Sequence, residues 1–288
     1  MPNHAAARLR ELLANAELLV CPVIGDPLAA RLVQQSGLPM ALLGGFGIAA
    51  TRFALPDTGL ITFTEVLDQV RSTCAAVPGF PIVADGDTGY GNAMNVRRTV
   101  RAFAEAGAAA ILIEDQVWPK KCGHYGGGRP VIGREEARMK IRAAVEARGD
   151  ADILIMARTD ARGSLGFDEA MARCRAFEAE GADILFAEAL ETEAELRTFA
   201  GGFQRPTWAN MMPKTPVASR AALRAMGFKV VTYNVLLHAA VRAMQDTLAA
   251  LAADDPARAP PTVSFADLTA LVGLPEYDAT AERYRAAE

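Results

Sequence analysis

The sequence predicts an α/β barrel of eight parallel strands, and three observations support this fold class. Eight short apolar runs alternate with helical patterns along nearly the whole chain of 288 residues. The runs are continuously apolar, which indicates strands buried on both faces, as in a parallel sheet covered by helices. Two units keep the same register, from Gly107 to Glu114 and from Gly181 to Glu188. Eight such units in about 250 residues favour a TIM barrel over an open sheet.

The strands are predicted, in chain order, at ELLVCPVI, PMALLG, FPIVAD, AAILIED, DILIMAR, ADILFAE, PTWAN and FKVVTYN. Helices are predicted between them. In NVRRTVRAFAEAG, for example, Val96, Val100 and Phe103 recur at helical spacing. Glycines near the ends of such patterns are suited to left-handed helix caps, and they are Gly107, Gly149, Gly181 and Gly227.

A long apolar helix is predicted at VLLHAAVRAMQDTLAAL, and the proline-rich segment DDPARAPPT follows it. The remaining tail contains two shorter helical patterns. We therefore predict one domain over residues 1–288, with the barrel at about 1–253 and a C-terminal helical extension at 254–288 that packs on a neighbouring subunit.

Composition and charge exclude several classes of partner. The net charge is -4 with acids and bases interspersed, so there is no basic patch for nucleic acid. No apolar run approaches the ~20 residues needed to cross a membrane. The N-terminus lacks a secretory signal pattern, and the four cysteines form no C-x-x-C pair. We expect a cytoplasmic protein that acts on a small molecule.

Acidic residues follow two neighbouring predicted strands. Asp85 and Asp87 lie in ADGDTGYGN after the third strand, and Glu114 ends the fourth. Active sites of TIM barrels form at these strand ends, and oxygen ligands without His or Cys suit Mg²⁺, with Mn²⁺ as a substitute. The alternative is a solvated loop for the aspartates and a strand-end salt bridge for Glu114.

Two further polar residues are placed at strand ends. Arg158 ends the buried run ILIMAR, where an unpaired charge would be costly, so it needs a structural carboxylate or a substrate carboxylate as its partner. Asn210 is either a satisfied structural amide or a donor to substrate. The sequence leaves both choices open.

The segment GFGIAA matches a dinucleotide-binding fingerprint after a strand. That fingerprint requires an uninterrupted helix to follow it. Pro56 and Gly59 break the helical pattern within the next few turns, which argues against a Rossmann site.

The segment KKCGHYGGG places Cys122 among Lys120, Lys121 and His124, ahead of three glycines. Nearby cations favour the thiolate form of a cysteine, so Cys122 is a candidate acid/base. The alternative is a flexible surface loop in which the cysteine is incidental.

The segments DGDTGYGN, IEDQVWPKKCGH, ARTDA and LFAEAL occur in the order and spacing of the isocitrate lyase/phosphoenolpyruvate mutase superfamily, which the chain resembles over most of its length. KKCGH resembles the branch of isocitrate and methylisocitrate lyases. The resemblance implies a TIM barrel, Mg²⁺ dependence, a mobile lid between the fourth strand and the fourth helix, and a homotetramer with exchanged C-terminal helices.

The resemblance also implies roles for individual residues. It assigns to the metal Asp57, Asp85, Asp87 and Glu114. It assigns to catalysis Cys122, Lys120, Lys121, His124 and Glu188. It assigns to substrate binding Gly44, Gly45, Phe46, Gly123, Arg158, Asn210 and Thr215.

One departure from the superfamily pattern concerns Leu42 and Gly44, which stand where related lyases usually carry Tyr and Ser. LPDTGLITFTE and GYGNAMNVRRTV are similar to the oxaloacetate decarboxylase branch. The leading hypothesis is a Mg²⁺-dependent carbon-carbon lyase acting on a 2-hydroxy di- or tricarboxylic acid, such as 2-methylisocitrate or a substituted malate. The alternatives are an oxaloacetate decarboxylase or hydrolase and a noncatalytic metabolite-binding barrel.

Overall fold

The computed structural model describes residues 3–122, 129–149, 151–211, 215 and 219–285. The chain divides into two compact units, Met1–Val235 and Leu236–Glu288. Within the described residues, no helix is both long and apolar enough to cross a membrane.

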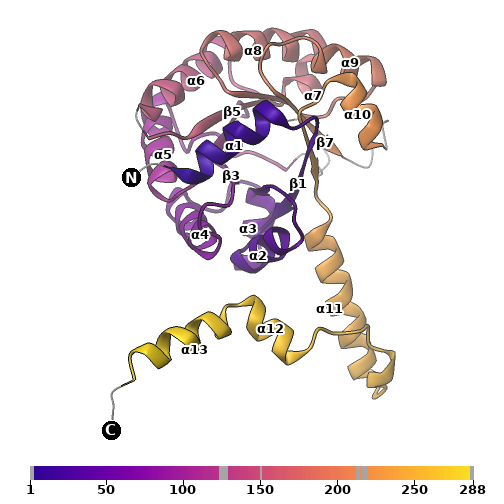
Figure 1. Cartoon of the computed structure of the whole chain (residues 1–288). Helices are drawn as coiled ribbons and strands as arrows, with labels where there is room; N and C mark the ends of the chain where they lie inside the picture. Colours follow the sequence, from indigo (N-terminus) through magenta and orange to yellow (C-terminus); the bar gives the residue numbers. More distant parts are fainter. Residues whose placement is uncertain (1–2, 123–128, 150, 212–214, 216–218, 286–288) are drawn as a thin grey trace. The chain divides into compact units, whose positions relative to one another are not determined.

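The first unit contains a closed barrel in which each strand pairs in parallel with the next and β8 pairs with β1 (Figure 1). The predicted eight-stranded α/β barrel is therefore confirmed. Its strands are β1 Leu19–Ile24, β2 Ala41–Leu43, β3 Ile82–Asp85, β4 Ala110–Glu114, β5 Leu154–Thr159, β6 Ile184–Ala187, β7 Thr207–Met211 and β8 Val230–Tyr233.

The first helix of this unit precedes β1, and the others connect successive strands and cover the outside of the barrel (Figure 1). These helices are α1 His4–Asn15, α2 Pro27–Gln35, α3 Gly45–Phe53, α4 Phe63–Ala76, α5 Ala93–Glu105, α6 Arg134–Arg148, α7 Ala161–Leu165, α8 Phe167–Ala179, α9 Glu193–Ala200 and α10 Arg220–Met226. The second unit contains α11 Leu236–Ala252, the 3₁₀ turn η1 Pro256–Arg258, α12 Phe265–Leu271 and α13 Leu274–Arg283.

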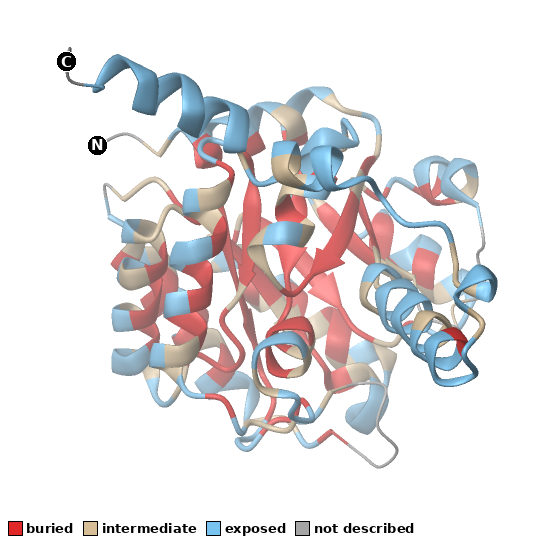
Figure 2. Cartoon of the chain, turned by 90° about the horizontal axis from the view of Figure 1, so that it is seen from below, coloured by how far each residue is buried: buried red, intermediate tan, exposed pale blue. Residues whose placement is uncertain are grey.

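Two apolar clusters explain why the strands are apolar at every position. Successive side chains of a strand point to opposite faces. In β5, Leu154 and Met156 join the cluster inside the barrel, whereas Ile155 and Ala157 join the cluster under the outer helices. Figure 2 shows the strands as a buried core. Leu9 of α1 belongs to the inner cluster, so this helix covers the N-terminal end of the barrel.

Local sequence signals account for many of the helix ends. Capping boxes begin α4, α5 and α9, where side chains satisfy backbone N–H groups that lack helical partners. The four glycines predicted as caps all have positive φ angles, which glycine adopts without steric cost. Cys174 is fully buried on α8, as its helical spacing predicts.

Two glycines bring the end of β1 against the first turn of α3. A Cβ added to Gly47 would lie 2.8 Å from the Cα of Gly25 and 2.8 Å from the carbonyl oxygen of Ile24. Both contacts are with backbone atoms, which cannot rotate away as a side chain does. The glycines of GFGIAA therefore permit close backbone packing within the barrel.

We expect Gly47→Ala to lower the free energy of unfolding by about 1–3 kcal/mol, because the added methyl forces β1 and α3 apart. Urea unfolding followed by circular dichroism measures this change. Gly163→Ala is the matched control, since its Cβ would meet only a side-chain nitrogen of Arg129 at 3.8 Å. Equal stability of the two variants would contradict the packing argument.

Candidate active site

A pocket of about 660 Å³, including space open to solvent, lies where the barrel strands end. Side chains from several strands line it together: Asp85 from β3, Glu114 from β4, Arg158 from β5, Glu188 after β6 and Asn210 from β7. The parallel direction of the strands brings these residues to one end of the barrel, although they are far apart in the chain.

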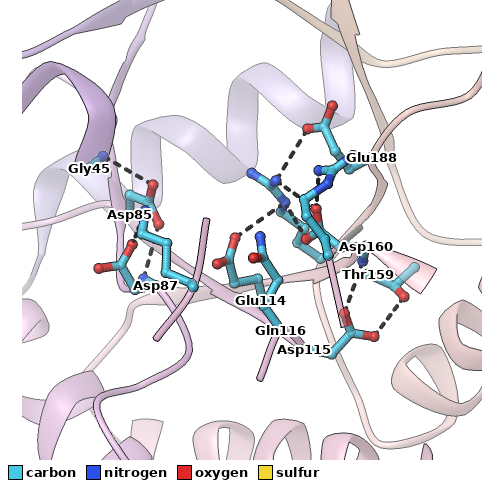
Figure 3. Close-up of polar contacts among 12 residues, drawn as sticks. Gly45, Asp85, Asp87, Glu114, Asp115, Gln116, Thr159, Asp160 and Glu188 are labelled. Carbon is cyan, nitrogen blue, oxygen red and sulfur yellow. Dashed lines mark hydrogen bonds and ion pairs between the residues drawn. The ribbon is translucent and has the colours of Figure 1, made fainter. Parts of the chain in front are cut away.

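Three aspartates surround the ammonium group of Lys120. Its Nζ lies 2.6 Å from Oδ1 of Asp57 and 2.7 Å from Oδ1 of Asp87. The carboxylate of Asp85 instead accepts two backbone hydrogen bonds, from the N–H of Asp87 at 3.0 Å and from the N–H of Gly45 at 3.0 Å. Figure 3 shows Asp85 and Asp87 beside Gly45. The loop after β3 is thereby tied to the start of α3.

The charges of this cluster are strongly coupled because most of them are buried. Burial raises the pKa of Asp87 to about 7; the carboxylates of Asp85 and Asp57 add to the rise, and the ammonium of Lys120 opposes it. Burial alone would lower the pKa of Lys120, but the surrounding carboxylates raise it well above its ordinary value. A single ammonium therefore does not neutralise the acidic cluster.

Two carboxylate oxygens near the pocket have neither a hydrogen bond nor an ion pair within the described part of the chain. They are the buried atoms Oδ2 of Asp87 and Oε1 of Glu114. Among the described residues, no three acidic, His or Cys side chains lie close enough together to enclose a metal ion. The carboxylate oxygens at this pocket are therefore too far apart to coordinate a metal ion without water or substrate ligands.

Arg158 is held by carboxylates of the protein. Asp160 accepts from Nε and from Nη2 of Arg158, both at 2.9 Å. Glu114 and Glu188 lie at 3.4 and 3.5 Å from nitrogens of the same guanidinium. Figure 3 shows Glu114, Asp160 and Glu188 grouped on one side of the site. Of the two partners that the sequence left open for Arg158, a carboxylate of the protein is therefore present, and it is Asp160.

A buried network behind Arg158 was missed by the sequence analysis. Asp160 is completely buried and also pairs with Arg129. Its backbone N–H donates to Asp115, which also binds Arg173 of α8 at 3.0 Å. The motifs EDQ and RTD, which contain Asp115 and Asp160, held the only signal that could have found them. This network fixes the position of the guanidinium.

Asn210 and Glu188 form a hydrogen bond across β6 and β7. Nδ2 of Asn210 donates to Oε2 of Glu188 at 3.2 Å. Thr215 donates its hydroxyl to the backbone carbonyl of Asn210 at 3.2 Å, and it is not among the residues that line the pocket. Within the described residues, Oδ1 of Asn210 is buried without a hydrogen-bond partner.

Cys122 lines the same pocket as the acidic residues, next to Lys120 and Lys121. Its backbone N–H donates to the carbonyl of Asp57 at 3.0 Å, and the N–H of Lys121 donates to Oε1 of Gln116 at 2.9 Å. Backbone bonds therefore hold the thiol at the acid cluster. The predicted residues Gly123 and His124, with most of the predicted lid, lie outside the described residues.

Gly44, Gly45 and Phe46 line the pocket at the N-terminal end of α3. A Cβ on Gly45 would lie 3.1 Å from Oδ1 of Asp87, 3.2 Å from Nζ of Lys120 and 3.4 Å from Oδ2 of Asp85. The acidic cluster therefore packs directly against this glycine, and a side chain at position 45 would displace it.

We expect Gly45→Ala to decrease kcat/KM by up to about 10-fold with little change in stability. The contacts of 3.1–3.4 Å require the charged groups to move by a few tenths of an ångström, and a displacement of about 1 Å at a reaction centre costs about 100-fold. Steady-state kinetics and thermal unfolding of the same preparation test both parts. Gly133→Ala is the control, since its Cβ would meet nothing within 4 Å. Unchanged kinetics in Gly45→Ala would show that the cluster is not at the reaction centre.

Comparison with known proteins agrees with this geometry. The family model described as phosphoenolpyruvate phosphomutase matches residues 9–252. The chain is 40% identical over 276 residues to 2,3-dimethylmalate lyase of Eubacterium barkeri, covering 94% of this chain and 95% of the relative. It is 45% identical over 229 residues to 2-methylisocitrate lyase of Aeropyrum pernix, covering 79% and 73%. The chain belongs to the phosphoenolpyruvate mutase/isocitrate lyase superfamily.

Solved structures of the superfamily share the whole fold. Oxaloacetate acetylhydrolase in complex with 3,3-difluorooxalacetate superposes with a TM-score of 0.91 at 30% identity, covering 98% of this chain and 97% of that one. Phosphonopyruvate hydrolase in complex with oxalate and Mg²⁺ has a TM-score of 0.85 at 30% identity, covering 99% of each chain. With lyases among its curated relatives, the chain is a lyase of this superfamily.

The pocket of this superfamily member also has an apolar floor, which the sequence analysis did not identify. It is formed by Val23, Leu42, Phe186 and Trp208, which also belong to the apolar cluster inside the barrel, with Thr232 beside them. In the sequence these residues stand within the continuous apolar strands. The alternation of a strand could have found them, because residues two apart face the same side.

Proposed function

We propose that this lyase cleaves the C2–C3 bond of a 2-hydroxy di- or tricarboxylic acid, giving a 2-oxo acid and a carboxylate, with Mg²⁺ as its cofactor. The observation that carries the proposal is that one pocket is lined both by buried carboxylates at the strand ends and by the thiol of Cys122. Oxygen ligands and an acid/base beside them are what such a cleavage requires.

Mg²⁺ fits the oxygen donors of the pocket. It is usually held through one or two carboxylates and keeps several waters, which agrees with a donor set too open to enclose an ion alone. The unpartnered oxygens of Asp87 and Glu114 would accept hydrogen bonds from such waters. The carboxylates of Asp85 and Asp57 would be the other oxygen donors of the proposed Mg²⁺ site. When bound, Mg²⁺ would stabilise negative charge on substrate oxygens, and Mn²⁺ would substitute for it.

The cleavage itself is a retro-aldol reaction. The C2 hydroxyl loses its proton to a base, the C2–C3 electron pair moves onto C3, and the C2–O bond becomes the carbonyl of the 2-oxo acid. For the base we propose Glu188, which lies 3.5 Å from a nitrogen of Arg158 and accepts hydrogen bonds from the amide of Asn210 and from the backbone N–H of Ala189, both at 3.2 Å. The two oxygens of a carboxylate carry about four lone-pair sites, so one remains able to accept a proton.

Cys122 then donates its thiol proton to C3 of the carboxylate enolate. Lys121 beside it is exposed at the pocket and supports the thiolate that remains. Substrate carboxylates would be bound by Arg158, by Asn210 and by the N-terminal end of α3 at Gly44 to Phe46, since helix N-termini attract anions. Lys120 keeps the acidic cluster together.

A second candidate is an oxaloacetate decarboxylase or hydrolase. Leu42 and Gly44 favour it, because they remove a tyrosine and a serine that related lyases usually carry. The close fold match to oxaloacetate acetylhydrolase is consistent with it. Both candidate reactions would use the same acidic cluster, so only the identity of the preferred substrate distinguishes them.

Turnover of a panel of 2-hydroxy and 2-oxo di- and tricarboxylic acids tests the proposal. We expect a 2-hydroxy acid to have the highest kcat/KM, with activity lost in EDTA and restored by Mg²⁺. Product identification by mass spectrometry then shows the 2-oxo acid and the carboxylate. If oxaloacetate is the best substrate and no 2-hydroxy acid is cleaved, the second candidate replaces the first.

We also propose that the protein is a cytoplasmic homotetramer. Cys122 acts only in its reduced form, which a reducing compartment maintains. The long helix α11 has one exposed apolar face, formed by Val241, Met244, Leu248 and Leu251. Such a face is typical of a helix that packs on another subunit.

Light scattering after size exclusion should therefore give four times the chain mass of 30.6 kDa. Leu248→Asp should reduce this mass, because a charge on the apolar face opposes subunit contact. Arg242→Ala is the matched control on the polar side of α11, where Arg242 pairs only with Asp246 among the described residues. A monomeric wild-type chain would rule out the tetramer.

A further inference from the structure

We infer that the lyase selects substrates with alkyl substituents on C2 and C3 and rejects a third carboxylate, and that Val23, Leu42 and Gly44 determine this preference. The inference rests on the proposed cleavage and concerns the notch that these three residues form in the wall of the pocket.

The notch follows from the alternation of the strands. Four strands or their continuations carry a floor residue and, two positions later, a rim residue: Leu42 and Gly44, Phe186 and Glu188, Trp208 and Asn210, Thr232 and Asn234. Only the rim position of β2 in this set has no side chain. The rim is therefore open above Leu42.

Below that opening lie two aliphatic side chains from neighbouring strands. Val23 of β1 and Leu42 of β2 are paired in register, and they keep 9% and 8% of their surface exposed, against 0% for Trp208. A Cβ on Gly44 would lie 3.1 Å from Cγ1 of Val23. The missing side chain at position 44 is thus what leaves this aliphatic surface accessible from the pocket.

No free polar group is present among the described floor residues to receive a carboxylate. The hydroxyl of Thr232 accepts a hydrogen bond from the indole N–H of Trp208 and is also bonded to the thiol of Cys21. A hydroxyl has one hydrogen to donate, and that of Thr232 is directed to the sulfur of Cys21, so none is left for a carboxylate. A carboxylate placed there would lose water without gaining a partner.

The buried cations of the pocket lie at its rim, and none faces the floor. Lys120 pairs with Asp57 and Asp87, and Nε and Nη2 of Arg158 bind Asp160. The remaining N–H groups of Arg158, together with Asn210 and the N-terminal end of α3, would hold the two carboxylates of a malate skeleton at the rim. The remaining substituents on C2 and C3 then face the floor, where alkyl groups gain contacts and a third carboxylate does not.

A matched substrate series tests this inference with one assay. The series is 2-methylmalate, 2,3-dimethylmalate, 3-ethyl-2-methylmalate and 2-methylisocitrate, which differ only in hydrogen, methyl, ethyl or carboxymethyl on C3. Each releases pyruvate on cleavage, so coupled oxidation of NADH measures all four. We expect methyl to raise kcat/KM about 10-fold over hydrogen, and carboxymethyl to lower it at least about 100-fold below ethyl.

Two variants locate the preference in the notch. Gly44→Ser fills the space above Val23 and should reduce the methyl-over-hydrogen ratio to about 2-fold or less. Gly133→Ser is the matched control, because a Cβ at position 133 would meet nothing within 4 Å, and it should leave that ratio within about 2-fold of wild type. An unchanged ratio in Gly44→Ser, or a preference of the wild type for the carboxymethyl substrate, would overturn the inference.

Binding separates a failure of this inference from a failure of the proposed reaction. Titration calorimetry with Mg²⁺ compares 2,3-dimethylsuccinate with propane-1,2,3-tricarboxylate, neither of which can be cleaved. Tighter binding of the dimethyl compound supports the notch even if no substrate in the series reacts. Tighter binding of the tricarboxylate contradicts the notch even if the lyase reaction is confirmed.

Discussion

Asp85→Asn is expected to decrease kcat/KM by at least about 10³-fold while the barrel stays folded. The carboxylate of Asp85 lies at the pocket and accepts backbone hydrogen bonds from Asp87 and Gly45. Asparagine keeps the shape and one acceptor but loses the negative charge. We propose Asp85 as a ligand of Mg²⁺, and stabilisation of developing oxyanions by a metal contributes several kcal/mol to catalysis, so loss of this carboxylate should have an effect of this size.

For Asp85→Asn, the affinity for Mg²⁺ is measured as well as the reaction rate. Titration calorimetry should show weaker Mg²⁺ binding than in wild type, and circular dichroism should show an unchanged fold. Asp68→Asn is the control, because Asp68 is exposed and pairs with Arg52 outside the pocket. Wild-type activity that survives EDTA, or equal Mg²⁺ affinity of the two variants, would show that Asp85 is not part of a metal site.

Cys122→Ser is expected to lower kcat for the best 2-hydroxy acid by at least about 10²-fold with KM nearly unchanged. Cleavage produces a carboxylate enolate that must be protonated as it forms, and a positioned general acid contributes about 10²–10⁴-fold. The hydroxyl of serine occupies the same place but is a much weaker acid. An effect confined to kcat indicates a group that acts in the transition state.

Oxaloacetate decarboxylation provides an internal comparison for Cys122→Ser. Loss of CO₂ requires an electron sink but no thiol, so any such activity should survive the substitution. Cys74→Ser is the control, because Cys74 lies on α4 and does not line the pocket. If wild type prefers oxaloacetate and Cys122→Ser decarboxylates it equally fast, Cys122 has no role and the lyase reaction is wrong.

Much of the fold could be predicted because its signals are local. A strand buried on both faces needs apolar side chains at every position, and DILIMAR or AAILIED shows this directly in the chain. A helix needs one apolar face and a residue able to end it, which Val96, Val100 and Gly107 supply around α5. These patterns depend only on residues a few positions apart.

The pairing of charges could not be predicted in the same way. Arg158 clearly needed a carboxylate, yet the sequence left open whether that partner belongs to the protein or to a substrate, and it did not point to Asp160. Which carboxylate binds depends on distances of a few tenths of an ångström, 2.9 Å for Asp160 and 3.4 Å for Glu114. Such distances follow from rotamers and strand register, which no local pattern contains.

By itself, the sequence determined the eight strands, the barrel, the superfamily motifs and the polar residues that end the strands, because periodicity and spacing record burial along one chain. Only the tertiary structure decided that Lys120 lies between Asp57 and Asp87, and that Val23 and Leu42 are accessible beneath Gly44. Coulombic attraction and van der Waals contact act through space over a few ångströms. They are therefore set by how the closed barrel places separate strands side by side.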